Sequence, residues 1–206
     1  MENVIGFVGY ECEDIVLYLA IILNRLGKKV AIIDRTEQEL LLETLEIQDA
    51  RVNLDKEGEF FGIWISNQGT GQEAYDIVFY LFGYRLIHPK LYECESLVMV
   101  TDGVPAHASL LRKIGKWDRK QYLVIRNLVP MKHAGQYLAL LAENEHNYYE
   151  IPYSEKDLRM KYSLGAYTGN MIKKLSEEMK EALAALVVFL SPDYSERSVR
   201  SIMKKI

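Results

Sequence analysis

Short, continuous apolar runs alternate with longer segments of helical periodicity along this chain. The runs at residues 4–8, 30–33, 75–81, 96–101, 121–127 and 149–151 are rich in valine, isoleucine and other strand-forming residues. Continuous runs of this kind are typical of central parallel strands that are covered on both faces. The segments at 13–26, 36–46 and 169–190, and the one that follows Pro105, predict helices, and 51–54 with 59–66 predicts a hairpin around positions 55–58. The pattern predicts an α/β fold with three α/β/α layers around a mostly parallel, twisted sheet of about seven strands.

The segment 194–206 predicts a separate short helix with two different faces. Apolar residues recur there at helical spacing, and basic residues occupy the remaining positions. Such a helix can lie on an anionic membrane leaflet, where each basic residue contributes about 1 kcal/mol, or it can pack on its own domain or on a partner. The sequence leaves both open, and it divides the chain into a domain at 1–193 and a C-terminal amphipathic basic helix at 194–206. The membrane-contact candidates are Arg197, Val199, Arg200, Ile202, Met203, Lys204, Lys205 and Ile206.

Composition narrows the class of protein. Of 206 residues, 49% are hydrophobic and 26% are charged, which is enough to bury a sizeable core in one domain. The net charge of −4 argues against a general nucleic-acid-binding surface. Neither the two cysteines nor the four histidines have metal-ligand spacing, so no metal is expected. The longest apolar run, at 15–23, is shorter than the roughly 20 residues of a membrane span, which predicts a cytoplasmic protein, with peripheral membrane attachment through the tail as the further possibility.

The ends of the predicted strands carry local sequence words in a definite order. They read Gly27-Lys28-Lys29-Val30-Ala31-Ile32-Ile33-Asp34, then Tyr75-Asp76-Ile77-Val78, then Thr101-Asp102-Gly103-Val104-Pro105, then Asn127, and finally Ile151-Pro152.

In this order the words resemble the MinD/ParA family of deviant-Walker P-loop ATPases, which includes relatives that position pili, secretion machines and cellulose synthases. The resemblance covers most of the chain and implies a P-loop NTPase-like fold, a homodimer, and an adenine pocket near Asn127 and Pro152. It also implies that Asp34 corresponds to a residue near the attacking water or the metal. The alternative is another doubly wound fold, flavodoxin-like or receiver-like, whose strand ends coincide.

The segment that corresponds to the phosphate-binding loop departs from what phosphate binding needs. A P-loop needs closely spaced glycines, a lysine and a serine or threonine. This segment has one glycine, no lysine, no hydroxyl side chain and three carboxylates, and it is short. Acids at a helix start are stabilised by about 0.3–1 kcal/mol each, and there they repel an incoming phosphate. The candidate vestigial site is Gly9, Tyr10, Glu11, Cys12, Glu13 and Asp14.

Two further positions bear on the chemistry. Leu81 stands where the family has an aspartate linked to Mg²⁺, and leucine binds no metal. Asp34, without those partners, is predicted to cap the next helix. Cys12 lies at a helix start, but its acidic neighbours predict an inert thiol.

These observations predict a non-catalytic pseudo-ATPase that acts as an adaptor or positioning factor for a membrane-associated machine for pili, secretion or envelope biosynthesis. No cofactor is expected. The predicted partners are proteins of that complex, a second copy of the chain and, weakly, an anionic membrane. The first alternative is a weak ATP-binding switch of the same family, and the second is a plain α/β regulatory domain.

Overall fold

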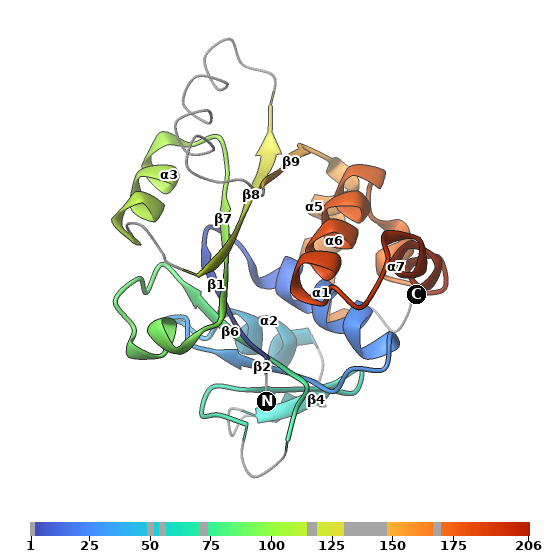
Figure 1. Ribbon diagram of the computed structural model, residues 1–206, viewed down its shortest axis with the longest axis horizontal. Coiled ribbons are helices and arrows are strands. Elements are labelled where there is room, and N and C mark those ends of the chain that lie inside the picture. Colours follow the sequence, from blue (N-terminus) through green and yellow to red (C-terminus); the bar gives the residue numbers. More distant parts are fainter. Residues whose placement is uncertain are drawn as a thin grey trace.

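A twisted sheet of nine strands runs through the part of the chain that the computed structural model describes, residues 3–48, 52–53, 57–70, 74–114, 119–129, 148–166 and 170–206 (Figure 1). Its order is β3-β4-β5-β2-β6-β1-β7-β8-β9, and every neighbouring pair is parallel except β3–β4 and β4–β5. The strands are β1 (Asn3–Gly9), β2 (Val30–Asp34), β3 (Val52–Asn53), β4 (Glu57–Phe60), β5 (Ile63–Ser66), β6 (Ile77–Gly83), β7 (Ser96–Thr101), β8 (Lys120–Leu128) and β9 (Tyr148–Pro152).

The position of β6 decides between the two sheet topologies left open by the sequence. β6 lies between β1 and β2 and pairs in parallel with both. In a flavodoxin-like or receiver-like sheet the first two strands are direct neighbours. The observed order therefore excludes that alternative and agrees with the P-loop type.

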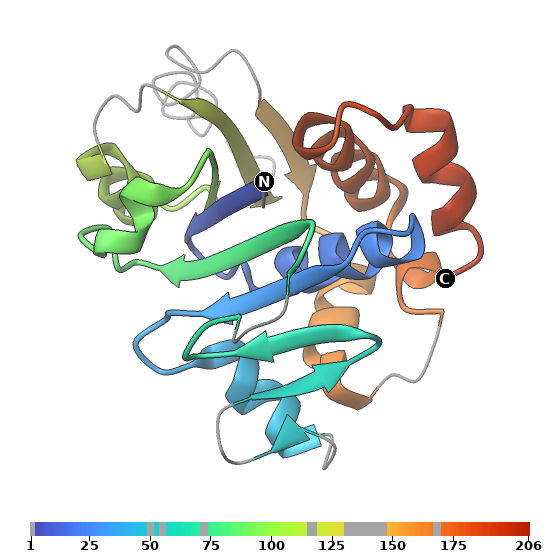
Figure 2. The ribbon, with the colours of Figure 1, turned by 60° about the horizontal axis from the view of Figure 1, so that its bottom comes forward.

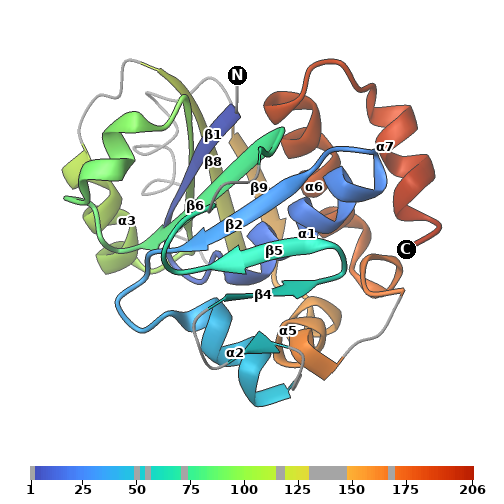
Figure 3. The same cartoon turned by 90° about the horizontal axis from the view of Figure 1, so that it is seen from below.

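Helices cover both faces of the sheet and produce the predicted three layers (Figures 2 and 3). The larger core cluster receives side chains from α1 (Glu13–Arg25), α2 (Leu40–Gln48), α5 (Glu155–Tyr162), α6 (Glu177–Leu190) and α7 (Glu196–Met203). A smaller cluster on the other face receives Leu91 from the 3₁₀ turn η1 (Pro89–Glu93) and Leu111 from α3 (Pro105–Leu111). Three further 3₁₀ turns are η2 (Arg112–Ile114), η3 (Leu164–Ala166) and η4 (Ile172–Lys174).

Helix α1 is the central helix of the larger layer. All its residues from Asp14 to Leu23 are buried, because the sheet covers one side and α6 and α7 pack on others. Under it, Phe7 and Phe79 of adjacent strands meet edge to face with ring centroids 5.1 Å apart. The helix that follows the first strand is therefore fixed in place over its whole length.

The structure corrects the predicted bounds of the hairpin. The predicted pairing is present, because β3 and β4 are antiparallel with Val52 opposite Gly58, but β4 already begins at Glu57, inside the predicted turn. A second turn at Phe61 and Gly62, which have φ angles of 53° and 78°, divides the predicted strand at 59–66 into β4 and β5. Positive φ at both central residues is what a tight two-residue hairpin turn requires. The hairpin extends the sheet beyond the predicted number of about seven strands.

Two predicted helices begin later than the apolar periodicity suggested. The helix predicted at 36–46 is α2, which begins at Leu40, and the described part of the helix predicted at 169–190 begins as η4 before α6 starts at Glu177. The reason at α6 is Ser176, whose hydroxyl accepts a hydrogen bond from the amide of Met179 at 3.1 Å. The buried Asp157 carboxylate holds Ser176 through its amide, at 2.7 Å, and its hydroxyl, at 2.6 Å.

Candidate functional site

The turn between β1 and α1 contains only three residues, Tyr10, Glu11 and Cys12. Gly9 has a φ of 115°, and a Cβ there would come within 1.9 Å of the carbonyl oxygen of Val100 on β7. The amide of Tyr10 donates to that same oxygen at 2.9 Å. The chain therefore passes tightly against β7 and enters the helix at once, whereas a P-loop motif extends over about eight residues.

A buried ion pair ties this turn and the start of α1 to β8. Arg126 on β8 donates through Nη1 to Asp14 Oδ1 at 2.6 Å and through Nη2 to Asp14 Oδ2 at 2.8 Å, while the side chains are 2% and 0% exposed. Nη1 also donates to the carbonyl oxygen of Glu11 at 2.5 Å. Burial disfavours the charge of Arg126, but the Asp14 carboxylate outweighs it and raises the arginine pKa above its ordinary value. The guanidinium is therefore held by the turn and the first turn of α1.

Helix α5 provides a second contact to the same turn. Lys161 Nζ lies 2.5 Å from a carboxylate oxygen of Glu11. Glu11 itself has a φ of 48°, a left-handed conformation that non-glycine residues adopt rarely. The two cations, one on its carbonyl and one on its carboxylate, keep Glu11 in that conformation.

Burial shifts the protonation equilibria of Cys12 and of Glu13, at the start of α1, toward their neutral forms. Cys12 is buried, and burial, followed by the nearby Glu13 and Asp14 carboxylates, raises the pKa of its thiol. Burial and a raised pKa both favour the predicted inert thiol. Burial also raises the pKa of Glu13. The acids lie in the first turn of α1 after Cys12, and Cys12 makes no side-chain capping hydrogen bond.

Asp34 and Leu81 are register partners on β2 and β6. Leu81 is fully buried in the larger core cluster, where an aspartate would have no water to share with a metal. Asp34 accepts hydrogen bonds from the amides of Leu41 and Leu42, at 2.9 and 3.3 Å, and from Thr36. The predicted helix-capping role of Asp34 is confirmed, and both of its carboxylate oxygens are engaged.

Asn127 and Pro152 lie close together at the ends of β8 and β9. The register pairs Leu128 with Pro152, and the amide of Tyr153 donates to the carbonyl of Leu128 at 3.0 Å. Asn127 has a φ of 57° and directly follows the buried Arg126. The two positions that the resemblance assigned to an adenine pocket are thus neighbours.

The tail forms α7, but its apolar face is covered. Val199 is 0% and Met203 3% exposed, and both belong to the larger core cluster, against which Ile206 also packs. These side chains are held by the domain itself, one of the alternatives that the sequence left open, so Val199 and Met203 are wrong as membrane contacts in this structure. Ile202 is partly buried.

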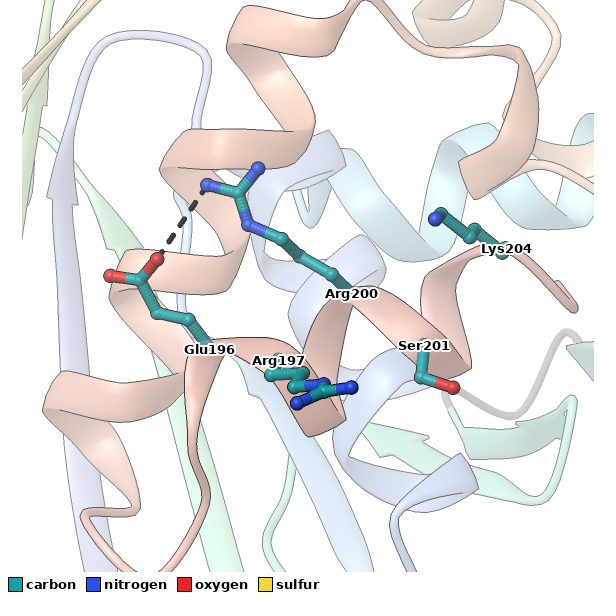
Figure 4. Close-up of a pocket in the computed structure, with 5 residues that line it drawn as sticks. All are labelled: Glu196, Arg197, Arg200, Ser201 and Lys204. Carbon is teal, nitrogen blue, oxygen red and sulfur yellow. Dashed lines mark ion pairs between the residues drawn. The ribbon is translucent and has the colours of Figure 1, made fainter.

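The exposed face of α7 is basic (Figure 4). Arg197, Arg200, Ser201 and Lys204, together with Glu196, line a shallow surface depression of about 610 Å³. Arg200 is shared between Glu196 at 3.6 Å and Glu181 at 3.4 Å. Lys205 is exposed on the neighbouring surface. Within the described residues, no helix is long and apolar enough to cross a membrane, and no group of three or more histidine, cysteine or acidic side chains is placed to hold a metal ion.

Solved structures with this arrangement of elements share little sequence with the chain. A putative plasmid partition protein of Borrelia burgdorferi, solved with AMPPNP, has a TM-score of 0.65 at 12% identity, covering 93% of this chain and all of that one. A chain of the MinC:MinD cell division protein complex of Aquifex aeolicus has a TM-score of 0.62 at 13% identity, covering 94% of this chain and 97% of that one. A ParA family ATPase of Chlorobium tepidum gives 0.53 at 14%, covering 98% and 96%. The sequence matches no protein-family model and no curated protein.

The chain therefore has the fold of the ParA/MinD-type P-loop ATPases. At these identities the similarity establishes the arrangement of strands and helices, which is the arrangement predicted from the strand-end words. The residues that do chemistry have to be judged from this chain's own geometry.

The structure gathers most of the predicted site residues at the carboxyl edge of the parallel strands. Sequence reasoning missed Arg126, although a signal was present, because an arginine within the apolar run at 121–127 must find a buried partner. It also missed Lys161, which is distant in sequence and gives no local signal.

Proposed function

We propose that this chain is a non-catalytic member of the ParA/MinD-type fold that acts as an adaptor or positioning factor for a membrane-associated machine. The observation that carries this proposal is the Asp14–Arg126 pair. In a P-loop the helix N-terminus and nearby cations hold the phosphates. Here the helix start is already occupied by a carboxylate of the chain itself, and the nearest cation is bound to that carboxylate.

The charge balance of the turn supports the same conclusion. Among the described residues, Asp14 pairs with Arg126 and Glu11 with Lys161, while Glu13 adds a third carboxylate, so a triphosphate would approach a turn with more acids than paired cations. Opening the turn would leave Arg126 or Asp14 buried without its partner, which costs about 3–5 kcal/mol. With Leu81 in the core and Asp34 engaged by α2, no metal ligand is available at the two positions that the resemblance would assign.

The runner-up is a weak ATP-binding switch, which the adjacent positions of Asn127 and Pro152 favour. Thermal unfolding with and without Mg·ATP separates the two. A ligand at about one hundred times its Kd stabilises a protein by about 2.7 kcal/mol. For a chain of this size, that raises the Tm by about 5–10 °C.

We expect no shift with millimolar Mg·ATP, and no turnover of ATP. A Mg²⁺-dependent rise of the Tm by several degrees, or micromolar binding of a fluorescent ATP analogue, would contradict the adaptor and support the ATP-binding switch. The pair is expected to block the turn by its size as well as by its charge. Removing the negative charge alone, as in Asp14→Asn, is therefore not expected to allow Mg·ATP to bind.

The basic face of α7 is the proposed contact with an anionic leaflet, through Arg197, Arg200, Lys204 and Lys205 and without apolar insertion. Each such residue contributes about 1 kcal/mol, so losing two of them weakens binding by about thirtyfold, and reversing their charge weakens it further because glutamate is repelled by an anionic leaflet. In a flotation assay with phosphatidylserine vesicles, the Arg197→Glu, Lys204→Glu double variant should no longer float with the vesicles. The Arg159→Glu control should float as the unchanged protein does. Charge reversal is preferable to truncation, because removing α7 would expose the core. Equal flotation of all three proteins would remove the membrane contact from the proposal.

A further inference from the structure

Three aromatic rings lie together beside the closed turn. Tyr10 stacks on His107 with ring centroids 4.2 Å apart and an interplanar angle of 14°. The ring of Tyr84 is tilted by 38° to the same imidazole, with ring centroids 6.0 Å apart. The three residues come from the end of β1, from the loop after β6 and from α3. Tyr84 is 38% exposed and the His107 side chain 27%, so the rings are accessible from solvent. We call Tyr10, Tyr84 and His107 the aromatic patch.

The orientation of the patch is fixed by Asp102. Its Oδ1 lies 2.9 Å from His107 Nδ1 and accepts the amide of Val104 at 2.9 Å, which also holds the start of α3. With Nδ1 engaged, the imidazole plane is held parallel to the ring of Tyr10. The patch is therefore a prearranged surface, which reduces the entropy lost when a ligand stacks on it.

The electrostatic surroundings of the patch are negative. Burial, followed by Glu11, raises the pKa of Tyr10 to about 12. Burial, followed by Asp102, raises the pKa of Tyr84 as well. At both hydroxyls a nearby carboxylate adds to the larger effect of burial. In the part of the chain that the structure describes, four acids (Glu11, Glu13, Asp14 and Asp102) lie around the turn, and the cations Arg126 and Lys161 are each already bound to one of them.

We propose that the aromatic patch receives an arginine side chain of a protein partner. A guanidinium is flat, stacks on aromatic faces, and is attracted by their negative potential and by the nearby carboxylates. Arginine is favoured over lysine because it is less strongly hydrated and lies flat on a ring. Val104, which is 45% exposed beside Asp102, offers the apolar contact that a surrounding peptide needs. The edge that binds an anion in a P-loop would thus take a cation here, and in this respect the inference rests on the proposed function.

The test uses the full chain, labelled with ¹⁵N, and the peptide acetyl-Gly-Arg-Gly-amide as the probe. The matched probe replaces arginine by citrulline, which has the same shape but no charge. We expect the arginine peptide, at millimolar concentration, to shift the amide signals of Tyr10, Tyr84 and His107, and the citrulline peptide to leave them unchanged.

Variants identify the ring contribution. A cation–π contact at an exposed site changes affinity about two- to fivefold, so Tyr84→Ala should weaken binding by that factor. Tyr84→Phe keeps the ring and should keep the affinity, and Tyr92→Ala, which removes an exposed tyrosine on η1, should also leave it unchanged. Equal binding of the citrulline peptide, an unchanged affinity of Tyr84→Ala, or no arginine-dependent shift would overturn the arginine site.

The same samples are titrated with Mg·ATP, so that the two proposals fail separately. Absence of binding by both ligands refutes the arginine site and leaves the pseudo-ATPase standing. ATP binding at the turn refutes the proposed function, whatever the peptide does.

Discussion

Removing one partner of the Asp14–Arg126 pair tests the interaction that closes the turn. Asp14→Asn keeps the size of the side chain and removes its charge, leaving a guanidinium that is 2% exposed without a counter-ion. Two unit charges about 4 Å apart interact by about 4 kcal/mol at an effective dielectric constant of about 20. Loss of one partner of a buried pair is observed to cost about 3–5 kcal/mol. The Coulomb estimate and the observed losses agree in magnitude.

The expected loss is readily measured by urea unfolding followed by circular dichroism. With an m-value of about 2 kcal/mol/M, the midpoint of Asp14→Asn should fall by about 1.5–2.5 M. Glu155→Gln is the matched control, because Glu155 and Arg159 form an exposed pair at 2.7 Å with side chains 68% and 77% exposed. Such a pair contributes about 0.5 kcal/mol or less, so the control midpoint should hardly move.

The single variants Asp14→Leu and Arg126→Met and the double variant that combines them form a double-mutant cycle. Replacing both charges by apolar side chains of similar volume leaves no uncompensated charge, and such replacements are often neutral or stabilising. The double variant should therefore be more stable than Asp14→Asn alone. The reasoning is refuted if Asp14→Asn behaves like the Glu155→Gln control, or if the effects of the two single substitutions simply add.

Two other features of the turn make predictions of their own. Gly9→Ala should abolish folding or lower the urea midpoint far more than Gly27→Ala, because the Cβ at Gly9 meets a carbonyl oxygen of β7 at 1.9 Å whereas nothing lies within 4 Å at Gly27. Gly27→Ala retains only the left-handed backbone penalty of about 1–2 kcal/mol, and equal midpoints would contradict the close approach. The pKa of Tyr10 is raised to about 12 in the folded protein, above the value of about 10 in the unfolded chain. Because the unfolded chain loses this proton first, the free energy of unfolding should decline as the pH rises from about 10 to about 12. Tyr10→Phe should lessen that decline, and identical midpoint-against-pH curves for the two proteins would disprove it.

The order of elements was readable from the chain because the relevant signals are local. Continuous apolar runs mark buried parallel strands, and the strand-end words, including those at Asp34 and Pro152, resemble a family whose P-loop type of fold the structure confirms. The second hairpin turn, at Phe61 and Gly62, was missed, because a phenylalanine at a φ of 53° gives no turn signal in a sequence. Its left-handed conformation is imposed by the pairing of β4 with β5.

The fate of the tail shows the same division. Its amphipathic period was correctly read from Val199 and Met203, but amphipathicity states only that one face needs cover, not what covers it. In the structure, α1 and α6 cover this face. No local pattern in the tail indicates that these two helices are its partners.

By itself, the sequence determined the fold class, and it predicted the loss of phosphate-binding chemistry at residues 9–14. Those properties follow from residue types at short spacing, which act through backbone propensity and charge. Only the tertiary structure decided what fills the turn, because Asp14 and Arg126 are separated by most of the chain and meet where β1 and β8 end at one edge of the sheet. Contact between distant residues depends on how the whole chain packs, and no local pattern encodes it.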